Sequence, residues 1–229
     1  DVKAMYRTEE LPIECNLHEV NEKTSDEISV ELLTSNCYSY YARVIKDVKI
    51  KEEPCILPYR DAFTKLGINP NKYMCSIEAL MTRISKGKDI PSINPIVDLG
   101  NALSLKYELP LGVHDIDNFI DGNIEIREAT KDDIFIPFGS TEIEHPEEGE
   151  IIYASNTEVK TRRWTWRQGE NSKITEKSTN LFIPIDGFTE NLDKIKELQN
   201  ELIDILKNQL NLEVAFGIVD KNNPEFITK

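Results

Sequence analysis

Three polar side chains recur at helical spacing in the stretch 92–119, in the middle of the 229-residue chain. Asn94, Asp98 and Asn101 stand at positions i, i+4 and i+7, so they form one polar stripe on a helix. We expect Ser92 to cap this helix, because its hydroxyl can accept a hydrogen bond from an N–H group of the first turn. The stripe predicts a helix that faces a cleft, and the alternative, a stripe that faces bulk water, stays open. The remaining surface of this helix is apolar and carries Ile93, Ile96, Val97, Leu99, Ala102 and Leu103.

The same stretch continues into a cluster of groups that can transfer protons. Pro110 and Gly112 end the helix, and the chain then delivers His114, Asp115 and Asp117 within four residues. An unperturbed histidine has a pKa of about 6.5, so it can position or deprotonate a water molecule near neutral pH. We therefore predict that the active site lies in this stretch.

A basic and aromatic run, residues 160–168, supplies a second set of candidate groups. Its composition predicts a strand whose side chains alternate between two faces. Arginine and tryptophan together can pair with phosphate and stack on a base or a ribose. Alternatively, the arginines stack on the tryptophans only to cover one face of a sheet. The candidate nucleic-acid contacts are Lys160, Arg162, Arg163, Trp164, Trp166 and Arg167.

A carboxylate follows this basic run directly, in a turn that begins at Gly169. We therefore take Glu170 as a further candidate for the site. The formal net charge of the chain is -14, and phosphate neutralisation by lysine and arginine supplies most of the nonspecific affinity for nucleic acid. Any contact with RNA must therefore be local.

Hydrophobic periodicity outlines the elements that would position these groups. Apolar residues at i, i+3, i+4 and i+7 predict a helix over 74–86 and a long helix over 190–210, and a shorter helix is expected over 59–66. The segments 11–15 and 28–33 fit either short strands or helical turns. We expect a single domain over 1–229. Strands are predicted over 123–128, 134–138, 150–153, 178–185 and 214–219.

Composition narrows the class of protein. Four cysteines without a Cys-x-x-Cys pair, and histidines at positions 18, 114 and 145, lack the spacing of metal ligands, so we expect no metal and no other cofactor. No apolar run approaches the roughly 20 residues that span a membrane, and the first residues do not resemble a signal peptide. We expect a soluble, cytoplasmic protein that contacts neither a membrane nor DNA.

The motifs at 93–117 and 169–172 resemble the editing domain of the phenylalanyl-tRNA synthetase beta subunit, and more closely its free-standing single-domain relatives. In that family an Ile-Asn…Val-Asp-x-x-Asn helix leads to a turn with His-x-x-Asp. A strand with a central arginine, here Arg127, follows, and a Gly-Glu-x-Ser turn comes later. These features appear here in the same order, and the resemblance spans about 73–184.

The resemblance implies an α+β fold, with a β-sandwich-like sheet core flanked by helices. It also implies a pocket that hydrolyses the ester of a wrongly charged aminoacyl-tRNA, with His114, Asn101 and Glu170 on the catalytic positions. Gly100 stands where the synthetase usually has threonine, and Pro91-Ser92 stand where it often has Arg-Pro. The accepted side chain therefore need not be tyrosine. Substrate contacts are expected from Asn94, Asp98, Gly100, Asp117 and Arg127.

The expected function is that of a trans-editing deacylase, which acts on the aminoacylated 3′ end of tRNA and does not charge tRNA itself. Because the ester is already labile, holding the carbonyl, placing a water and stabilising an oxyanion suffice. His114 would place the water, Asn101 would orient the ester or bind the α-amino group, and Glu170 would pair with that amino group or read the side chain. Two alternatives stay open: a catalytically silent module that binds tRNA, an amino acid or a protein partner, and a purely structural role.

Overall fold

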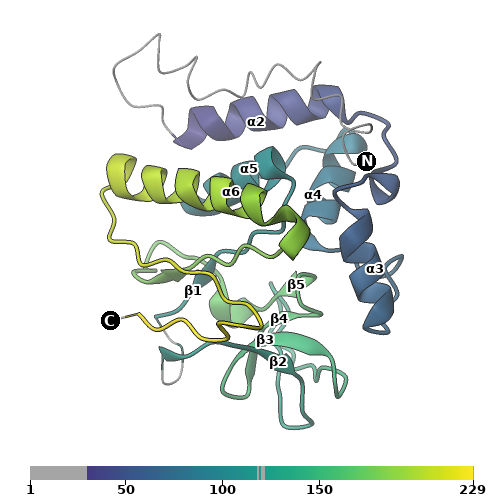
Figure 1. Ribbon diagram of the computed structural model, residues 1–229, viewed down its shortest axis with the longest axis vertical. Helices are drawn as coiled ribbons and strands as arrows, with labels where there is room; N and C mark the ends of the chain where they lie inside the picture. The colour runs from purple at the N-terminus through teal and green to yellow at the C-terminus, as the bar shows by residue number, and fades with distance from the viewer. Residues whose placement is uncertain (1–29, 118, 120–121, 229) are drawn as a thin grey trace.

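The computed structural model describes residues 30–117, 119 and 122–228, and shows an α+β fold in which helices cover small antiparallel sheets (Figure 1). This confirms the fold class expected from the sequence. Segment 11–15 lies outside the described residues, and segment 28–33 enters a helix at Val30. The α-helices are α2 (Val30–Val44), α3 (Leu57–Lys65), α4 (Ser76–Ser85), α5 (Pro95–Tyr107) and α6 (Leu192–Asp204).

The strands form two separate antiparallel sheets. The larger sheet has the order β2-β3-β4-β5, and the smaller sheet pairs β1 with β6, so that His114 lies opposite Phe182. Residues far apart in sequence therefore meet in the smaller sheet. The strands are β1 (His114–Asp115), β2 (Glu125–Glu128), β3 (Ile151–Ser155), β4 (Glu158–Arg162), β5 (Arg167–Gln168) and β6 (Leu181–Phe182).

Aromatic contacts join the two sheets. The ring of Tyr153 on β3 stacks on the ring of His114 on β1, with a centroid distance of 6.4 Å and an interplanar angle of 22°. Phe182 on β6 lies 6.3 Å from Tyr153 and 6.1 Å from His114. His114 is therefore held where the sheets meet.

Two hydrophobic clusters attach the helices to this sheet core. One cluster joins α5 and α6 to the segment after α5, and it contains Leu103, Leu111 and Leu202. The other lies among α2, α3 and α4, and the half-buried rings of Trp164 and Trp166 pack against it. Figure 1 shows the resulting helical layer, with α2, α5 and α6 on one side of the sheets.

Most predicted helices are confirmed. The helix expected over 74–86 is α4, that over 59–66 is α3, and that over 190–210 is α6 continued by a π-helical turn, Ile205–Gln209. The helix of the polar stripe is α5, but its N-cap is Asn94 and not Ser92. Asn94 Oδ1 accepts a hydrogen bond from the N–H of Val97 at 3.0 Å. Proline thus occupies the first helical position, where its missing N–H removes no helical bond.

Three of the predicted strands are wrong. Residues 160–168 are a hairpin and not one strand, because Arg163 and Trp164 adopt φ values of 46° and 59° and reverse the chain between β4 and β5. Segment 134–138 makes only isolated bridges, and segment 214–219 pairs with no strand among the described residues. A strand exists only where a partner edge meets it, and a local pattern does not specify that partner. The helices of the described ranges include none long and apolar enough to cross a membrane.

Candidate functional site

A cavity of about 270 Å³ opens between α5, the segment around β1 and the hairpin that joins β4 to β5. Ligand pockets start at roughly this size, so the cavity suits a group as small as an amino acid. Predicted site residues from three separate stretches meet in its wall. They are Gly100, Asn101, His114, Trp164, Trp166 and Arg167.

His114 is a buried polar residue of this wall, only 2% exposed. Its Nδ1 shares a hydrogen bond of 3.0 Å with Ser172 Oγ. Among the described residues, no hydrogen bond occupies Nε2. A Cβ atom on Gly112 would lie 3.0 Å from Nε2, so a glycine keeps space open beside this nitrogen. Nε2 is therefore the atom through which His114 can contact a ligand or a water molecule.

The environment of His114 changes its acid–base behaviour. Burial, followed by the positive charge of Lys160, lowers the pKa of His114 to about 4. Lys160 is itself 1% exposed, and its Nζ lies 2.7 Å from Glu158 Oε2. The imidazole is therefore neutral at physiological pH, and it is a weaker base than the value of about 6.5 for free histidine suggests.

Helix α5 contributes the opposite part of the wall through Gly100 and Asn101. A Cβ atom at Gly100 would lie 2.8 Å from Val113 Cγ2 and 3.0 Å from Leu111 Cδ2. The threonine that the synthetase family usually has at this position would not fit without movement of these neighbours. Gly100 therefore acts through close packing of α5 against the segment before β1, and Asn101 is the polar group that α5 presents to the cavity.

The other two members of the polar stripe have different roles from those expected. Asn94 caps α5, and buried Asp98 holds the chain before the helix. One oxygen of Asp98 accepts a hydrogen bond from the Ser92 hydroxyl, and the other accepts one from the N–H of Ile93 at 3.0 Å. Neither Asn94 nor Asp98 lines the cavity. The stripe therefore reaches the cavity only at Asn101, because the first turn of α5 uses its polar groups to fix its own start.

Glu170 lies in a short 3-10 helix, Glu170–Ser172, and it does not line the cavity. Its Oε2 accepts a hydrogen bond from the N–H of Gly139 at 2.8 Å, and its Oε1 pairs with Lys173. The hydrogen bond from Lys173, followed by that from Gly139, lowers the pKa of Glu170. Lys173, by contrast, lines the cavity. The structure thus brings His114 and Asn101 together, whereas Glu170 reaches the cavity only through its partner Lys173.

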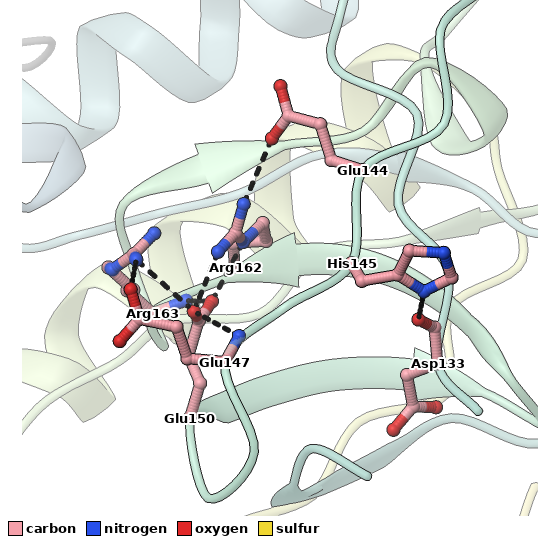
Figure 2. Close-up of polar contacts among 7 residues, drawn as sticks. All are labelled: Asp133, Glu144, His145, Glu147, Glu150, Arg162 and Arg163. Atoms are coloured by element: carbon pink, nitrogen blue, oxygen red, sulfur yellow. Dashed lines mark hydrogen bonds and ion pairs between the residues drawn. The ribbon is translucent and has the colours of Figure 1, made fainter. Parts of the chain in front are cut away.

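Two arginines of the basic run, expected from the sequence to contact nucleic acid, are buried in ion pairs (Figure 2). Arg162 binds both oxygens of Glu150 at 2.8 and 2.9 Å, and a third nitrogen lies 2.9 Å from Glu144 Oε2. Arg163 lies 3.3 Å from Glu147 and 3.4 Å from Glu150, and its backbone N–H donates to Glu150 at 3.0 Å. These contacts stabilise the hairpin, and Lys160 is buried beside them in the same strand as Arg162.

The remaining members of the basic run lie at the cavity. Trp164 Nε1 donates a hydrogen bond of 2.7 Å to Asp186, and its ring packs against the rings of Tyr59 and Phe188. Trp166 is half-buried. Arg167 is exposed and forms no ion pair with any other described residue. Arg167 is therefore the arginine of this run that is positioned to contact an external phosphate.

Two residues expected to contact the substrate lie outside the cavity and bind other parts of the chain. Arg127 clamps buried Asp133 through hydrogen bonds of 2.7 and 2.8 Å, and it also donates to the carbonyl of Asn156. Asp117 is exposed and accepts hydrogen bonds from the N–H groups of Thr179 and Asn180, and these bonds, led by that of Thr179, lower its pKa to about 2. Neither side chain lines the cavity, because each is used to fix a turn.

The cavity also contains polar groups that sequence reasoning did not identify. Gln168 Nε2 donates to the carbonyls of Val113 and Ser172, at 2.9 and 2.8 Å. These bonds hold the residue before His114 and the serine that hydrogen-bonds its ring. Asp186 is the single charged residue of the otherwise apolar run Ile183 to Gly187, and this isolated charge is the one feature of the run that could have indicated a site residue. Within the described ranges, no group of three or more histidine, cysteine or acidic residues is arranged to hold a metal ion. His145 instead hydrogen-bonds the carbonyl of Asp133 at 2.9 Å (Figure 2).

Comparisons with known proteins place this site in a family. The phenylalanine–tRNA ligase beta subunit of Oceanobacillus iheyensis is 28% identical over 175 residues, which are 76% of this chain and 18% of that protein. The same subunit from Staphylococcus haemolyticus is 27% identical over 184 residues, 80% of this chain and 20% of the relative. That from Fusobacterium nucleatum is 28% identical over 159 residues, 69% of this chain and 16% of the relative.

The chain thus spans about a fifth of the length of these curated relatives. A family model described as the B3/4 domain matches residues 58–202, a range that includes α4, α5, the sheets and most of α6. This range contains the segment 73–184 in which the motifs were recognised, so the expected relation to the phenylalanyl-tRNA synthetase beta subunit is confirmed. The chain belongs to the B3/4 domain family.

Proposed function

We propose that this chain hydrolyses the ester bond of mischarged aminoacyl-tRNA, acting in trans and without charging tRNA itself. The observation that carries the proposal is the cavity of amino-acid size, in which Nε2 of a buried, neutral His114 is available to a ligand. Exposed Arg167 in the same wall supports an anionic ligand such as the end of a tRNA. Family membership supports the same class of ligand, since the relatives are subunits of a tRNA ligase.

The reaction breaks the bond between the aminoacyl carbonyl carbon and the ribose oxygen of the tRNA. A water oxygen attacks the carbonyl carbon, one water proton ends on the released ribose hydroxyl, and the other leaves to solvent from the new carboxylic acid. Because an aminoacyl ester is already labile, orientation of the water and stabilisation of the developing oxyanion supply the acceleration.

In this proposal His114 orients the attacking water. Its hydrogen bond with Ser172 fixes the ring, and with the proton on Nδ1 the free Nε2 accepts a hydrogen bond from the water. Since its pKa is about 4, His114 acts mainly by positioning and only weakly by removing a proton.

Asn101 on α5 is the second polar group of the site, and its amide orients the ester or binds the α-amino group of the substrate. Glu170 acts at one remove, because its carboxylate holds Lys173 at the cavity. Lys173 and Arg167 are then the two cations that receive the phosphates near the tRNA end. Trp166 offers an aromatic face to the terminal base or ribose.

A second candidate function is a binding module that holds an aminoacyl end or an amino acid without cleaving it. Two observations favour it: the weak basicity of His114, and the pairing of Glu170 with Lys173 instead of with a ligand. The two candidates share one pocket and differ only in whether the ester is broken.

The test is single-turnover deacylation with a panel of correctly and incorrectly charged tRNAs, for the wild type, His114→Ala and Asp132→Asn. We expect the wild type to release at least one amino acid faster than buffer does and His114→Ala to lose this activity. Asp132→Asn, which changes an exposed carboxylate outside the cavity, should retain it. Circular dichroism confirms that each variant is folded. Binding of charged tRNA without ester loss for any member of the panel would contradict the deacylase and favour the binding module.

A further inference from the structure

The cavity wall contains a carboxylate that the proposed hydrolysis does not use. Asp186 lies after β6, and three aromatic residues from three other segments hold it. Tyr153 Oη and Trp164 Nε1 donate hydrogen bonds of 2.6 and 2.7 Å to the same oxygen, Oδ1, and Tyr59 Oη donates to the backbone carbonyl at 2.9 Å. The carboxylate is therefore rigidly placed through one of its two oxygens.

The second oxygen of Asp186 is not matched by a cation. No hydrogen bond from the described residues reaches Oδ2, and no lysine, arginine or histidine among them pairs with this carboxylate. Burial raises the pKa of Asp186 to about 6, against the opposing effect of the bonds from Tyr153 and Trp164. Above this pH the carboxylate of Asp186 is ionised and has no paired cation among the described residues, an arrangement that folded proteins rarely keep unless a ligand uses it.

A second unsatisfied polar group lies in the same wall. The hydroxyl of Thr165 is buried and has no hydrogen-bond partner within the described part of the chain. Most buried polar atoms in proteins have a partner, so an orphaned hydroxyl beside a ligand-sized cavity points to a missing donor or acceptor. Trp164 and Trp166, on either side of Thr165, add aromatic faces that attract cations. The wall thus combines a carboxylate, a buried hydroxyl without a partner among the described residues, and aromatic rings, beside the two cations Arg167 and Lys173.

We propose that Asp186 binds an ammonium group of the aminoacyl substrate. The identity of the substrate in this statement rests on the proposed deacylase function, whereas binding of an ammonium group does not. The ammonium can be the α-amino group, which every aminoacyl ester carries, or a cationic side chain such as that of lysine or ornithine. This assignment transfers the cation-binding role from Glu170, which Lys173 already neutralises, to Asp186.

The change Asp186→Asn tests the proposal with little structural disturbance. The amide oxygen of asparagine can still accept the hydrogen bonds from Tyr153 and Trp164, while the negative charge is lost. Asp132→Asn is the matched control, since it neutralises an exposed carboxylate outside the cavity.

The ligands are adenosine analogues in which the aminoacyl group is joined to the 3′ position by an amide, so that they cannot be hydrolysed. One carries a lysyl group, one the uncharged norleucyl group of similar length, and one an N-acetyl-norleucyl group that lacks any ammonium. Calorimetry measures the affinity of each analogue for the wild type and both variants.

We expect the Asp186→Asn variant to lose affinity by about tenfold or more for the analogue whose ammonium contacts Asp186, since a hydrogen bond to a charged group contributes about 1.5–3 kcal/mol. A loss for lysyl alone assigns the side-chain ammonium, and a loss for both lysyl and norleucyl assigns the α-ammonium. N-acetyl-norleucyl should bind equally to all three proteins. Should Asp186→Asn fail to fold, the wild type alone decides, because it must prefer an ammonium-bearing analogue over its uncharged counterpart by a similar factor.

Equal affinities of wild type and Asp186→Asn for all three analogues, or no binding of any analogue by the wild type, would overturn the inference. The deacylase proposal fails separately. Asp186-dependent binding without ester loss from any charged tRNA refutes hydrolysis and leaves the ammonium site standing. If Asp186→Asn instead releases every amino acid at the wild-type rate, hydrolysis stands and the ammonium site is refuted.

Discussion

His114 and Asp186 line one cavity, and the fold shifts both pKa values in the direction that favours the neutral side chain. Burial lowers the pKa of the histidine to about 4 and raises that of the aspartate to about 6, because charge is disfavoured away from water. The imidazole is neutral above pH 5, whereas the carboxylate ionises only as the pH approaches neutrality. These two residues therefore respond to pH over separate ranges.

The first prediction at the residue scale concerns the pH dependence of deacylation through His114. This imidazole stays neutral down to about pH 5. Protonation of His114 should therefore not lower the rate near pH 6.5, where a free histidine would titrate. His114→Ala should lower single-turnover deacylation by about a hundredfold, with little change in tRNA affinity. The measurement is the deacylation rate as a function of pH, for the wild type and for Ser172→Ala, which lacks the hydrogen bond to Nδ1. A rate that falls tenfold between pH 7 and pH 5.5 only when Ser172 is intact would contradict the assignment.

A second prediction concerns stability and Asp186. Its folded pKa, about 6, lies above the ordinary value of 3.8, so the folded state binds the proton more tightly than the unfolded chain does. The contribution of Asp186 to the free energy of unfolding is therefore most favourable below pH 3.8, and it decreases as the pH rises toward 6. Asp186→Asn should stabilise the protein relative to wild type by on the order of 1–2 kcal/mol at pH 7.5, and by much less at pH 4.

Urea unfolding of both proteins at the two pH values measures this difference. Tyr59 and Tyr153 do not titrate in this range, because their pKa values are raised above the ordinary value for tyrosine. His114, with a pKa of about 4, titrates at the low end in both proteins, so its effect cancels in the difference between them. A stability difference that is the same at pH 4 and pH 7.5 would show that the charge of Asp186 is not the cause.

At the scale of elements, the hairpin of β4 and β5 connects the sheet to the cavity. Its turn contains two consecutive residues at positive φ, Arg163 and Trp164, a conformation that is unfavourable for side chains other than glycine. Glu150 offsets this strain by binding Arg162, Arg163 and the backbone N–H of the turn at once (Figure 2). The hairpin in turn presents Thr165, Trp166 and Arg167 to the cavity.

The prediction at this scale is that Arg162→Gln destabilises the fold, because it leaves the buried carboxylate of Glu150 without its bidentate partner. Loss of one member of a buried ion pair typically lowers the free energy of unfolding by about 3–5 kcal/mol. Arg167→Gln, five residues later and exposed, is the matched control and should change it by less than about 0.5 kcal/mol. Thermal unfolding of the two variants measures this, and equal midpoints would show that the Glu150 network does not hold the turn.

At the scale of the whole molecule, the charge balance limits how this chain can contact tRNA. The net charge is -14, and buried Arg162, Arg163 and Lys160 are neutralised by glutamates. Arg167 and Lys173 are the cations that line the cavity. The chain should therefore depend on few phosphate contacts, in contrast to proteins that hold nucleic acid through a broad basic surface.

The matching prediction is that Arg167→Gln weakens tRNA binding and lowers the slope of log affinity against log salt by about one, as expected for one lost phosphate contact. Its folding should be unchanged. Titration of tRNA at several salt concentrations measures the slope. An unchanged slope would show that Arg167 does not contact the tRNA backbone.

The sequence by itself determined the elements and groups whose signals are local. The apolar periodicity of 74–86 and 190–210 identified α4 and α6, and the motifs around Asn101 and His114 identified the family, because helix periodicity and motif spacing are encoded within a few turns of chain. The single exposed arginine of the basic run could not be told from its buried neighbours, because all of them belong to one continuous charged pattern.

Only the tertiary structure decided which polar groups meet. Glu150 lies more than ten residues before Arg162, yet it binds both Arg162 and Arg163 in buried ion pairs. From the sequence alone, both arginines could have been phosphate ligands. Burial beside Lys160 lowers the pKa of His114, and the hydrogen bonds of Asp186 with Tyr153 and Trp164 hold its carboxylate in the cavity wall. Pairing, burial and pKa depend on distances between segments that are remote in sequence, and these distances are set by the packing of helices on sheets and by no local pattern.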